Sequence, residues 1–285
     1  MSNAPYGVAV SVDPLVRRVL APNATPFTGT GTQTHLVGRD TLAIIDPGPD
    51  DDAHLAALLR AIGDTPVAAI MVTHTHRDHS PLARRLAERV EAPVVGCAPL
   101  ALDDLGPRAD AAFDDSYAPD RVLADGERID GDGWTLEAVA TPGHTSNHLA
   151  FALPQAGALF SGDHVMGWST TIVSPPDGDM AAYMASLQKL FEREDDRIYF
   201  PAHGDVVENP RRLVRGLLGH RKQREGQILR LLRDDVAAVP AMVARMYAGI
   251  DQRMWPAAER SVLAHLIDLR QRGLAVEEGD AWRAA

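Results

Sequence analysis

The chain has 285 residues, 45% of them hydrophobic, which is enough to bury a sizeable core in one or two domains. Its single cysteine, Cys97, excludes a disulfide framework within the chain, and no run of 18 apolar residues predicts a membrane span. Charge is divided unevenly: residues 1–208 hold 14 Lys and Arg against 30 Asp and Glu (−16), whereas residues 209–285 hold 14 against 9 (+5). We therefore expect two modules that meet near residue 208, the first acidic and the second basic.

The first third of the chain predicts a sheet covered by helices. Residues 1–27 are proline-rich and lack clear periodicity, so we expect them to lie over the surface of the first module. A Gly/Thr turn then leads into a predicted hairpin with strands at residues 35–37 and 41–46. Helical spacing of leucines predicts a helix at residues 52–62. Residues 67–72 are apolar on both faces, which is typical of a strand in a sheet that helices cover.

The stretch Thr73–Ser80, which follows this strand, holds three imidazoles and one carboxylate: His74, His76, Asp78 and His79. Imidazole and carboxylate together suit Zn²⁺, and other first-row divalent metals are compatible with them. In an extended chain His74 and His76 point to the same side. Asp78 and His79 lie where the chain turns, so they can reach a second position. The stretch therefore favours two metal ions, and the alternative is a polar loop or a local metal-trapping tract.

Beyond this stretch the sequence predicts an alternation of short strands and helices. Strands are predicted at residues 93–96, 121–127, 134–140, 147–152, 158–160 and 197–200, and helices at residues 81–90 and 179–191. The aspartate-rich residues 103–120 predict an exposed loop. Because strands outnumber helices and helices flank both halves, we expect an α/β fold, an αββα sandwich.

Three more candidate ligands, His144, Asp163 and His203, lie where predicted strands end. Strand ends open into loops, and loops on a rigid scaffold are where sites are built. The expected ligands are His74, His76 and His144 for one ion and Asp78, His79 and His203 for the other, with Asp163 bridging the two.

The motifs H-x-H-x-D-H, T-P-G-H-T, S-G-D and P-x-H-G occur in this order over about residues 28–210. In this the chain resembles the metallo-β-lactamase superfamily of metal-dependent hydrolases, whose fold is an αββα sandwich. The resemblance implies two Zn²⁺ ions and a supporting role for Asp46, whose carboxylate would accept a hydrogen bond from a ligating histidine. Because no signal peptide is seen, we expect a cytoplasmic enzyme and not a periplasmic lactamase that degrades antibiotics.

Residues 209–285 predict three helices and a hairpin, an order typical of a winged-helix-like module. The helices are expected at residues 210–232, 240–247 and 256–271, and the hairpin at residues 274–284. Six basic side chains of the first helix are expected near the mouth of the cleft: Arg211, Arg212, Arg215, Arg221, Lys222 and Arg224. Arg221 and Lys222 are candidate contacts to a phosphate-bearing substrate, and Trp168 is a candidate pocket residue. The alternative is that these basic residues pair with acids of the first module.

Within the superfamily, the chain most resembles the branch of β-lactamase-like protein 2, with which it shares the sequence motifs G-T-x-T and S-G-D-x-V-x-G-x-S. Animal members of this branch are endoribonucleases selective for single-stranded RNA, and related fungal members are thioesterases that release polyketides from a carrier protein. The resemblance implies a hydrolase in which a metal-bridging hydroxide attacks the substrate. Asp78 and Asp163 would orient this hydroxide, and Asp78 would shuttle the proton.

Two substrate classes stay open. A small-molecule or carrier-bound ester or thioester is favoured by the charge of −16 on residues 1–208, which would repel a polyanion. Single-stranded RNA is favoured by the branch and by the charge of +5 on residues 209–285. No membrane partner is expected, and the sequence leaves the oligomeric state open.

Overall fold

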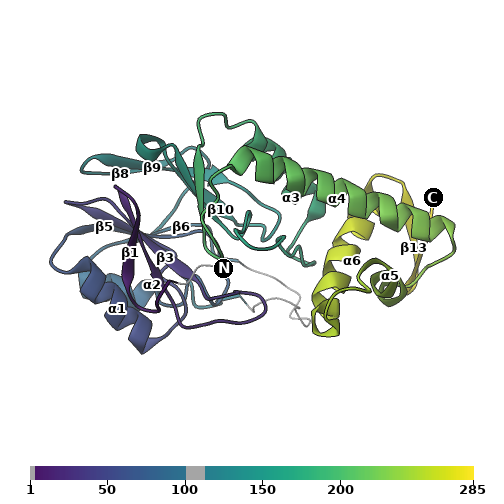
Figure 1. The fold of residues 1–285 in the computed structure, drawn as a ribbon, viewed down its shortest axis with the longest axis horizontal. Coiled ribbons are helices and arrows are strands. Elements are labelled where there is room, and N and C mark those ends of the chain that lie inside the picture. The colour runs from purple at the N-terminus through teal and green to yellow at the C-terminus, as the bar shows by residue number, and fades with distance from the viewer. Residues whose placement is uncertain (1–3, 101–112) are drawn as a thin grey trace.

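The structure is a computed structural model that describes residues 4–100 and 113–285. Two β-sheets pack face to face, helices cover both outer faces, and a helical module that carries the C-terminus extends from one end (Figure 1). The predicted α/β fold, an αββα sandwich followed by a helical module, is confirmed. No helix in the described part of the chain is both long and apolar enough to cross a membrane.

Among the described residues, the first sheet has seven strands in sequence order, antiparallel from β1 to β4 and parallel from β4 to β7. Its strands are β1 (Ala9–Asp13), β2 (Val16–Leu20), β3 (Gln33–Val37), β4 (Leu42–Ile45), β5 (Val67–Val72), β6 (Val94–Gly96) and β7 (Arg121–Val122). The predicted hairpin appears as β3 and β4, and β5 is buried along its second half.

The expectation of an irregular surface segment at residues 1–27 is wrong, because β1 and β2 form two strands of the first sheet. Val16 and Val19 of β2 are fully buried in the core. The prolines of this segment argue against strands when only the sequence is considered. In the structure Pro14 lies in the turn between β1 and β2 and interrupts neither strand, and sheets tolerate proline at such a position.

The second sheet has five strands in the order β12-β11-β10-β9-β8, with only β11 and β12 parallel. Its strands are β8 (Arg128–Gly131), β9 (Trp134–Ala140), β10 (Leu149–Leu153), β11 (Ala158–Gly162) and β12 (Ile198–Pro201). The predicted strand at residues 121–127 is wrong beyond Val122. Glu127 instead folds back, and its carboxylate accepts a hydrogen bond from Ala124 N at 2.5 Å, which makes a turn before β8.

The predicted exposed loop at residues 103–120 lies partly outside the described residues, which resume at Phe113. Where it is described, the segment is not a plain surface loop, because Asp114 and Tyr117 are both 7% exposed. Asp114 Oδ2 accepts a hydrogen bond from Ser80 Oγ at 2.8 Å. Residues 113–117 therefore pack against the turn that carries His79.

The helices begin and end close to the predicted residues. They are α1 (Asp52–Ile62), α2 (Ala83–Val90), α3 (Met180–Phe191), α4 (Pro210–Arg233), α5 (Val239–Met246) and α6 (Trp255–Gln271), with 3₁₀ turns η1 (Pro154–Ala156) and η2 (Gln252–Met254). Side chains of Asp51 and Asp179 cap α1 and α3, accepting hydrogen bonds from His54 N and Ala182 N at 2.7 Å. Gly63 ends α1 at a positive φ of 61°, a conformation that glycine adopts without strain.

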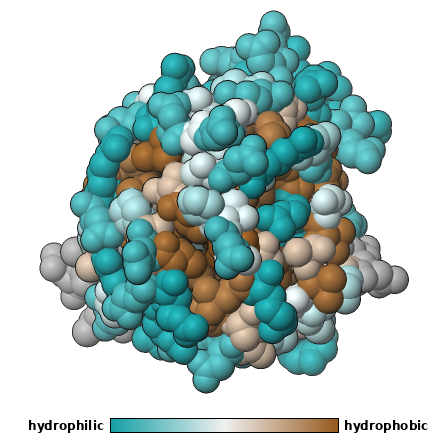
Figure 2. Space-filling view, turned by 90° about the vertical axis from the view of Figure 1, so that its left-hand side faces the viewer, coloured by the Kyte–Doolittle hydropathy of each residue, from teal (hydrophilic) through white to brown (hydrophobic). Residues whose placement is uncertain are grey.

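Three apolar clusters hold these layers together. The first fills the space between the sheets and beneath α1 and α2, where Ile70 of one sheet and Phe151 of the other are fully buried. Figure 2 shows the end of the molecule opposite the C-terminal module, where hydrophilic side chains surround apolar ones. The second cluster joins the outer face of the second sheet to α3 and the first half of α4, including Val214.

The third cluster forms the core of the C-terminal module, which consists of the second half of α4, helices α5 and α6, and a hairpin of β13 (Ala275–Glu278) and β14 (Ala281–Ala284). Ile228 and Leu232 of α4 belong to this cluster, whereas Val214 and Leu217 of the same helix belong to the second one. One continuous helix of 24 residues therefore joins the module to the sandwich.

Candidate metal centre

Seven side chains converge at the edge where strands of both sheets end. His74, His76, Asp78 and His79 lie in the loop after β5, and His144, Asp163 and His203 follow β9, β11 and β12. Their ligand atoms form two groups, each within 4.8 Å: His74, His76, His144 and Asp163, and Asp78, His79 and His203. The structure thus brings together all seven residues named from the sequence.

The first group has the spacing of a tetrahedral site. His76 Nδ1 lies 3.0 Å from His74 Nε2 and 3.1 Å from His144 Nε2. Asp163 Oδ2 lies 3.6 Å from His144 Nε2 and 4.0 Å from His74 Nε2. Donors that surround one Zn²⁺ at about 2.05 Å are roughly 3.3 Å apart, so the four donors fit a single ion.

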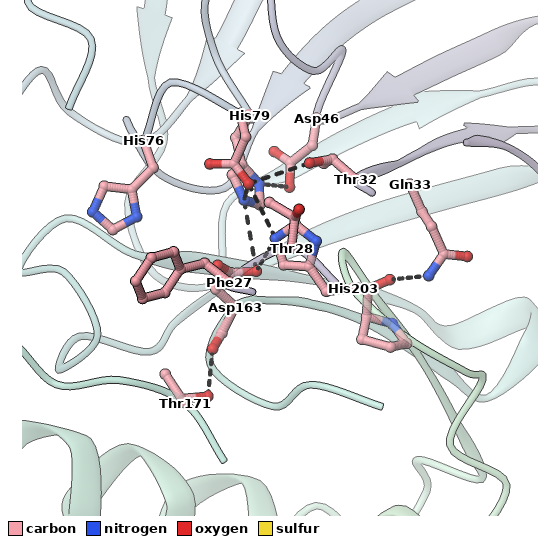
Figure 3. A network of polar contacts seen from close by, with 12 residues as sticks. Phe27, Thr28, Thr32, Gln33, Asp46, His76, His79, Asp163, Thr171 and His203 are labelled. Atoms are coloured by element: carbon pink, nitrogen blue, oxygen red, sulfur yellow. Dashed lines mark hydrogen bonds and ion pairs between the residues drawn. The ribbon is translucent and has the colours of Figure 1, made fainter. Parts of the chain in front are cut away.

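The second group faces the other oxygen of Asp163. Asp78 Oδ2 lies 3.1 Å from His203 Nε2 and 3.4 Å from His79 Nε2. Asp163 Oδ1 lies 3.2 Å from His203 Nε2 and 3.6 Å from His79 Nε2. Figure 3 shows Asp163, His79 and His203 converging from separate elements. The two oxygens of Asp163 therefore face different groups, which is the geometry that a bridging ligand requires.

Hydrogen bonds orient four of the five histidines so that Nε2 faces the centre. Nδ1 donates in each case: His74 to Thr73 Oγ1 at 3.0 Å, His79 to Asp46 Oδ2 at 2.9 Å, His144 to Ile172 O at 2.7 Å and His203 to Gly31 O at 3.2 Å. A neutral imidazole that donates from Nδ1 keeps the lone pair of Nε2 for a metal. The orientation of the imidazoles and the spacing of the donor atoms are independent observations. Each of them fits a pair of divalent cations.

The electrostatics of the second group also favour a cation. Although burial disfavours the charged imidazolium, the carboxylates of Asp163 and Asp78 raise the pKa of His203 to about 10. Burial is likewise overcome at His79, where Asp78, Asp163 and Asp46 raise the pKa well above its usual value. The carboxylates of Asp163 and Asp78 thus favour positive charge at this group, and protons or metal ions can supply it.

Asp46 supports the loop after β5 from beneath. Its Oδ1 accepts a hydrogen bond from Thr73 N at 2.8 Å, and its Oδ2 accepts one from Thr73 Oγ1 at 2.8 Å. Oδ2 also accepts a hydrogen bond from His79 Nδ1 at 2.9 Å, and Figure 3 shows these two residues side by side. The residue is 2% exposed and has a positive φ of 49°, a backbone conformation that Asp and Asn tolerate best. Asp46 is therefore hydrogen-bonded to His79, a candidate ligand, as the sequence predicts.

We expect Asp46→Asn to weaken the second group selectively. The amide keeps the volume and the backbone preference, but its NH₂ opposes the Nδ1–H of His79. A lost buried acceptor costs about 1–3 kcal/mol of folding stability, and second-sphere partners change metal affinity about 10–100-fold. Chelator competition would show a weaker affinity for one ion of two, with thermal unfolding as the stability measure. Unchanged affinity for both ions would contradict the role of Asp46.

The segment that follows Asp163 ties the site to the C-terminal module. Thr171 Oγ1 donates to the backbone O of Asp163 at 2.6 Å, and the guanidinium of Arg221 in α4 donates to Thr171 O. Arg221 is only 3% exposed. The sequence predicts Arg221 near the mouth of the cleft. The structure buries its side chain on the face of α4 that packs against the second cluster, where it lines the second pocket described below.

One pocket adjoins the centre, and a second pocket adjoins the first. The first has a volume of about 420 Å³ and is lined by His76, Asp78, His144, Asp163 and His203, together with side chains that include Phe27, Met166 and Ile172. A second pocket of about 520 Å³ lies between the segment after β11 and the C-terminal module. Trp168 lines the second pocket and not the first, whereas Lys222 is exposed and lines neither. Arg211 forms an ion pair with Glu194 at 3.3 Å. For this residue, the structure agrees with the alternative that the basic residues of α4 pair with acids of the first module.

Two hydroxyls of the site were not identified from the sequence. Thr32 Oγ1 donates to Asp78 Oδ2 at 3.2 Å, and Thr171 supports the backbone of Asp163. Thr32 belongs to the G-T-x-T motif, so a signal was present at that position. Thr171 lies among Ser and Thr residues that carry no distinguishing pattern.

The comparisons with known proteins agree with this geometry. Residues 28–203 match the metallo-beta-lactamase superfamily, and residues 238–282 match the beta-lactamase associated winged helix domain. The chain is 32% identical over 272 residues to the beta-lactamase-like protein 2 homolog of Drosophila melanogaster, covering 90% of this chain and 88% of that protein. It is 31% identical over 229 residues to an atrochrysone carboxyl ACP thioesterase of Aspergillus fumigatus, covering 78% of this chain and 66% of that protein.

Among solved structures, a beta-lactamase domain protein from Burkholderia ambifaria superposes with a TM-score of 0.79. The match covers 100% of this chain and 96% of that one at 22% identity, so it supports the fold alone. An αββα sandwich with histidine and aspartate donors at one sheet edge defines a class of metal-binding hydrolases. This chain belongs to the metallo-β-lactamase superfamily, and its C-terminal module is a winged helix domain.

Proposed function

We propose that the chain is a binuclear metal-dependent hydrolase that cleaves an ester or thioester, with two Zn²⁺ ions as cofactors. The observation that carries the proposal is Asp163, whose two oxygens face two separate donor groups at the floor of a 420 Å³ pocket. When bound by the two donor groups, two divalent cations would lower the pKa of water towards neutral and polarise the group under attack.

The residues of the chain supply orientation and proton transfer. Asp163 and Asp78 hold an attacking water between the two groups, and Thr32 fixes Asp78 through its hydrogen bond at 3.2 Å. Asp78 is partly exposed to the pocket, so its carboxylate can pass a proton to the leaving group. Phe27, Met166 and Ile172 narrow the pocket with apolar surface and limit the access of bulk water.

The ester or thioester class is supported by the thioesterase relatives and by the charge around the site. The sandwich is acidic, and the basic residues of α4 do not line the metal pocket. A polyanion would be repelled by such a surface. Single-stranded RNA remains the alternative substrate to be tested beside the esters.

The test compares three substrates at equal enzyme concentration: p-nitrophenyl acetate, S-octanoyl pantetheine and a fluorophore-labelled single-stranded RNA. We expect hydrolysis of the ester and the thioester by metal-replete protein, with RNA cleavage at least about 100-fold slower. Cleavage of RNA without cleavage of either acyl substrate would overturn the proposal and leave the nuclease hypothesis in its place.

We also expect two metal ions per chain, predominantly zinc, in protein purified without chelator. Both donor groups are complete in the described residues, and each offers at least three ligand atoms. Elemental analysis measures the stoichiometry, and a chelator should abolish hydrolysis until metal is restored. A stoichiometry of one in fully active protein, with Asp78 and His79 unligated, would contradict the binuclear centre.

A further inference from the structure

The second pocket adjoins the metal pocket directly. Phe27, Met166 and Ile172 line both of them, so a substrate that reaches the metal donors can continue into the second space. The far wall of this space comes from α4 and from the winged helix domain, through residues of α6 and of the segment between α5 and α6. Its volume of about 520 Å³ is within the range of small-molecule sites.

Much of the wall of this pocket is apolar. Trp168 and Ile250, which are 36% and 44% exposed, are among the most exposed large hydrophobic side chains of the described residues. Met254 and Ala258 lie on the same wall, as does Tyr247. Apolar surface that the chain itself leaves uncovered around a concave space is typical of a site for an apolar part of a ligand.

One end of the pocket is cationic. Arg221 is 3% exposed, and its Nε has no hydrogen-bond partner among the described residues. The guanidinium of Arg224 lies 4.4 Å from the ring centroid of Tyr247 and donates to Met246 O at 3.3 Å. Within residues 4–100 and 113–285, neither arginine forms an ion pair with an aspartate or glutamate. A buried cation without a carboxylate is costly, so an anion would be stabilised at this end.

The charge is felt by neighbouring groups as well. Burial, and then the positive charge of Arg221, lower the pKa of His265 to about 3. His220 itself lines the pocket, and its Nδ1 has no partner in the described part of the chain. Burial and the two arginines lower its pKa too, so the histidine offers a neutral hydrogen-bonding group and the arginines carry the charge.

We propose that the second pocket binds an anionic group carried on an apolar arm of the substrate, while the scissile ester or thioester occupies the metal pocket. Arg221 and Arg224 receive the anion, and Trp168 and Met254 contact the arm. The inference deepens the proposed function and rests on it. The anion belongs either to the acyl group, as a carboxylate, or to the leaving group, as a phosphate such as that of phosphopantetheine.

Ala258 allows a matched test. It lines the second pocket, does not line the metal pocket, and is half-buried, so a longer side chain there points at the same space. Ala258→Glu adds a carboxylate that competes with a substrate anion for the arginines. Ala258→Gln has the same size and no charge, so the difference between these two variants isolates the charge.

Two substrate pairs differ only by the anion. p-Nitrophenyl hemisuberate is compared with p-nitrophenyl octanoate for an acyl carboxylate, and S-octanoyl phosphopantetheine with S-octanoyl pantetheine for a leaving-group phosphate. p-Nitrophenyl acetate serves as the substrate too short to reach the second pocket. Hydrogen bonds between charged groups contribute enough for about a tenfold effect.

We expect wild-type protein to prefer the anionic member of at least one pair by about tenfold in kcat/KM. Ala258→Glu should remove this preference, Ala258→Gln should retain it, and hydrolysis of the acetate should be unchanged in both. Calorimetry gives a second measurement: if the carboxylate pair is the preferred one, suberate should bind to wild type and Ala258→Gln and not to Ala258→Glu. The preferred pair identifies the source of the anion.

Several results would overturn the inference. Hydrolysis of all esters and thioesters without preference within either pair, or equal losses in the two Ala258 variants, would refute the second pocket as an anion site while leaving the proposed function intact. No hydrolysis of any acyl substrate would refute both. If the cleavage of RNA, and not the hydrolysis of any acyl substrate, depended on the charge at position 258, the second pocket would be a site for nucleic acid.

Discussion

His76→Ala is expected to lose hydrolysis of every substrate by at least about 1,000-fold while the protein stays folded. His76 Nδ1 contacts the ligand atoms of both His74 and His144, at 3.0 and 3.1 Å, so its removal opens the first donor group. The apolar clusters do not include His76. The loss should therefore appear in kcat/KM and in metal content, with little change in the thermal midpoint of the chelated protein.

His54→Ala provides the opposite pattern as a control. His54 is 1% exposed and is hydrogen-bonded to Thr34 Oγ1 at 2.9 Å, outside both donor groups. Loss of a buried side chain and its hydrogen bond costs about 1–3 kcal/mol of stability, and activity per folded molecule should be retained. If His76→Ala keeps more than about a tenth of the wild-type activity, which is only ~1.4 kcal/mol of barrier, the first group does not carry the chemistry.

The donor residues could be predicted from the sequence because each motif is local and each stands at a strand end. The spacing of His74, His76, Asp78 and His79 contains most of the geometry, and apolar runs place His144 and Asp163 at the same sheet edge. What remained open was which nitrogen of each histidine faces the centre of the donor groups, since that depends on acceptors distant in sequence. His144 and Ile172, for example, are 28 residues apart.

The second pocket could not be predicted for the same reason. Phe27, Trp168, Arg221 and Ala258 come from segments separated by long stretches of chain, and no local pattern links them. The number of basic residues on α4 indicates a positively charged helix, but it does not show which of their side chains face the protein interior. Burial decides that Arg221 faces inward and Lys222 faces solvent, and burial depends on how α4 packs against α3 and α6.

Asp163→Asn is expected to remove the second of the two metals and to lower hydrolysis by at least about 1,000-fold. Asp163 belongs to the first group and also faces the second: Oδ2 lies 3.6 Å from His144 Nε2, and Oδ1 lies 3.2 Å from His203 Nε2. Asparagine keeps the shape but replaces one oxygen by an NH₂, which cannot bind a cation, and it removes the negative charge between the two ions. Two cations about 3.5–4 Å apart then repel each other without that compensation.

The matched control is Asp177→Asn, which makes the same chemical change at a carboxylate that is also buried, 6% exposed, and accepts from Ser146 N at 3.2 Å. Asp177 belongs to neither donor group, so two ions and near wild-type kcat/KM should be retained. Metal content by elemental analysis and kcat/KM on p-nitrophenyl acetate are measured for both variants. Because the first group keeps three histidines, we expect one ion to remain in Asp163→Asn. If Asp163→Asn instead binds two ions and has activity within tenfold of wild type, Asp163 does not bridge the centre.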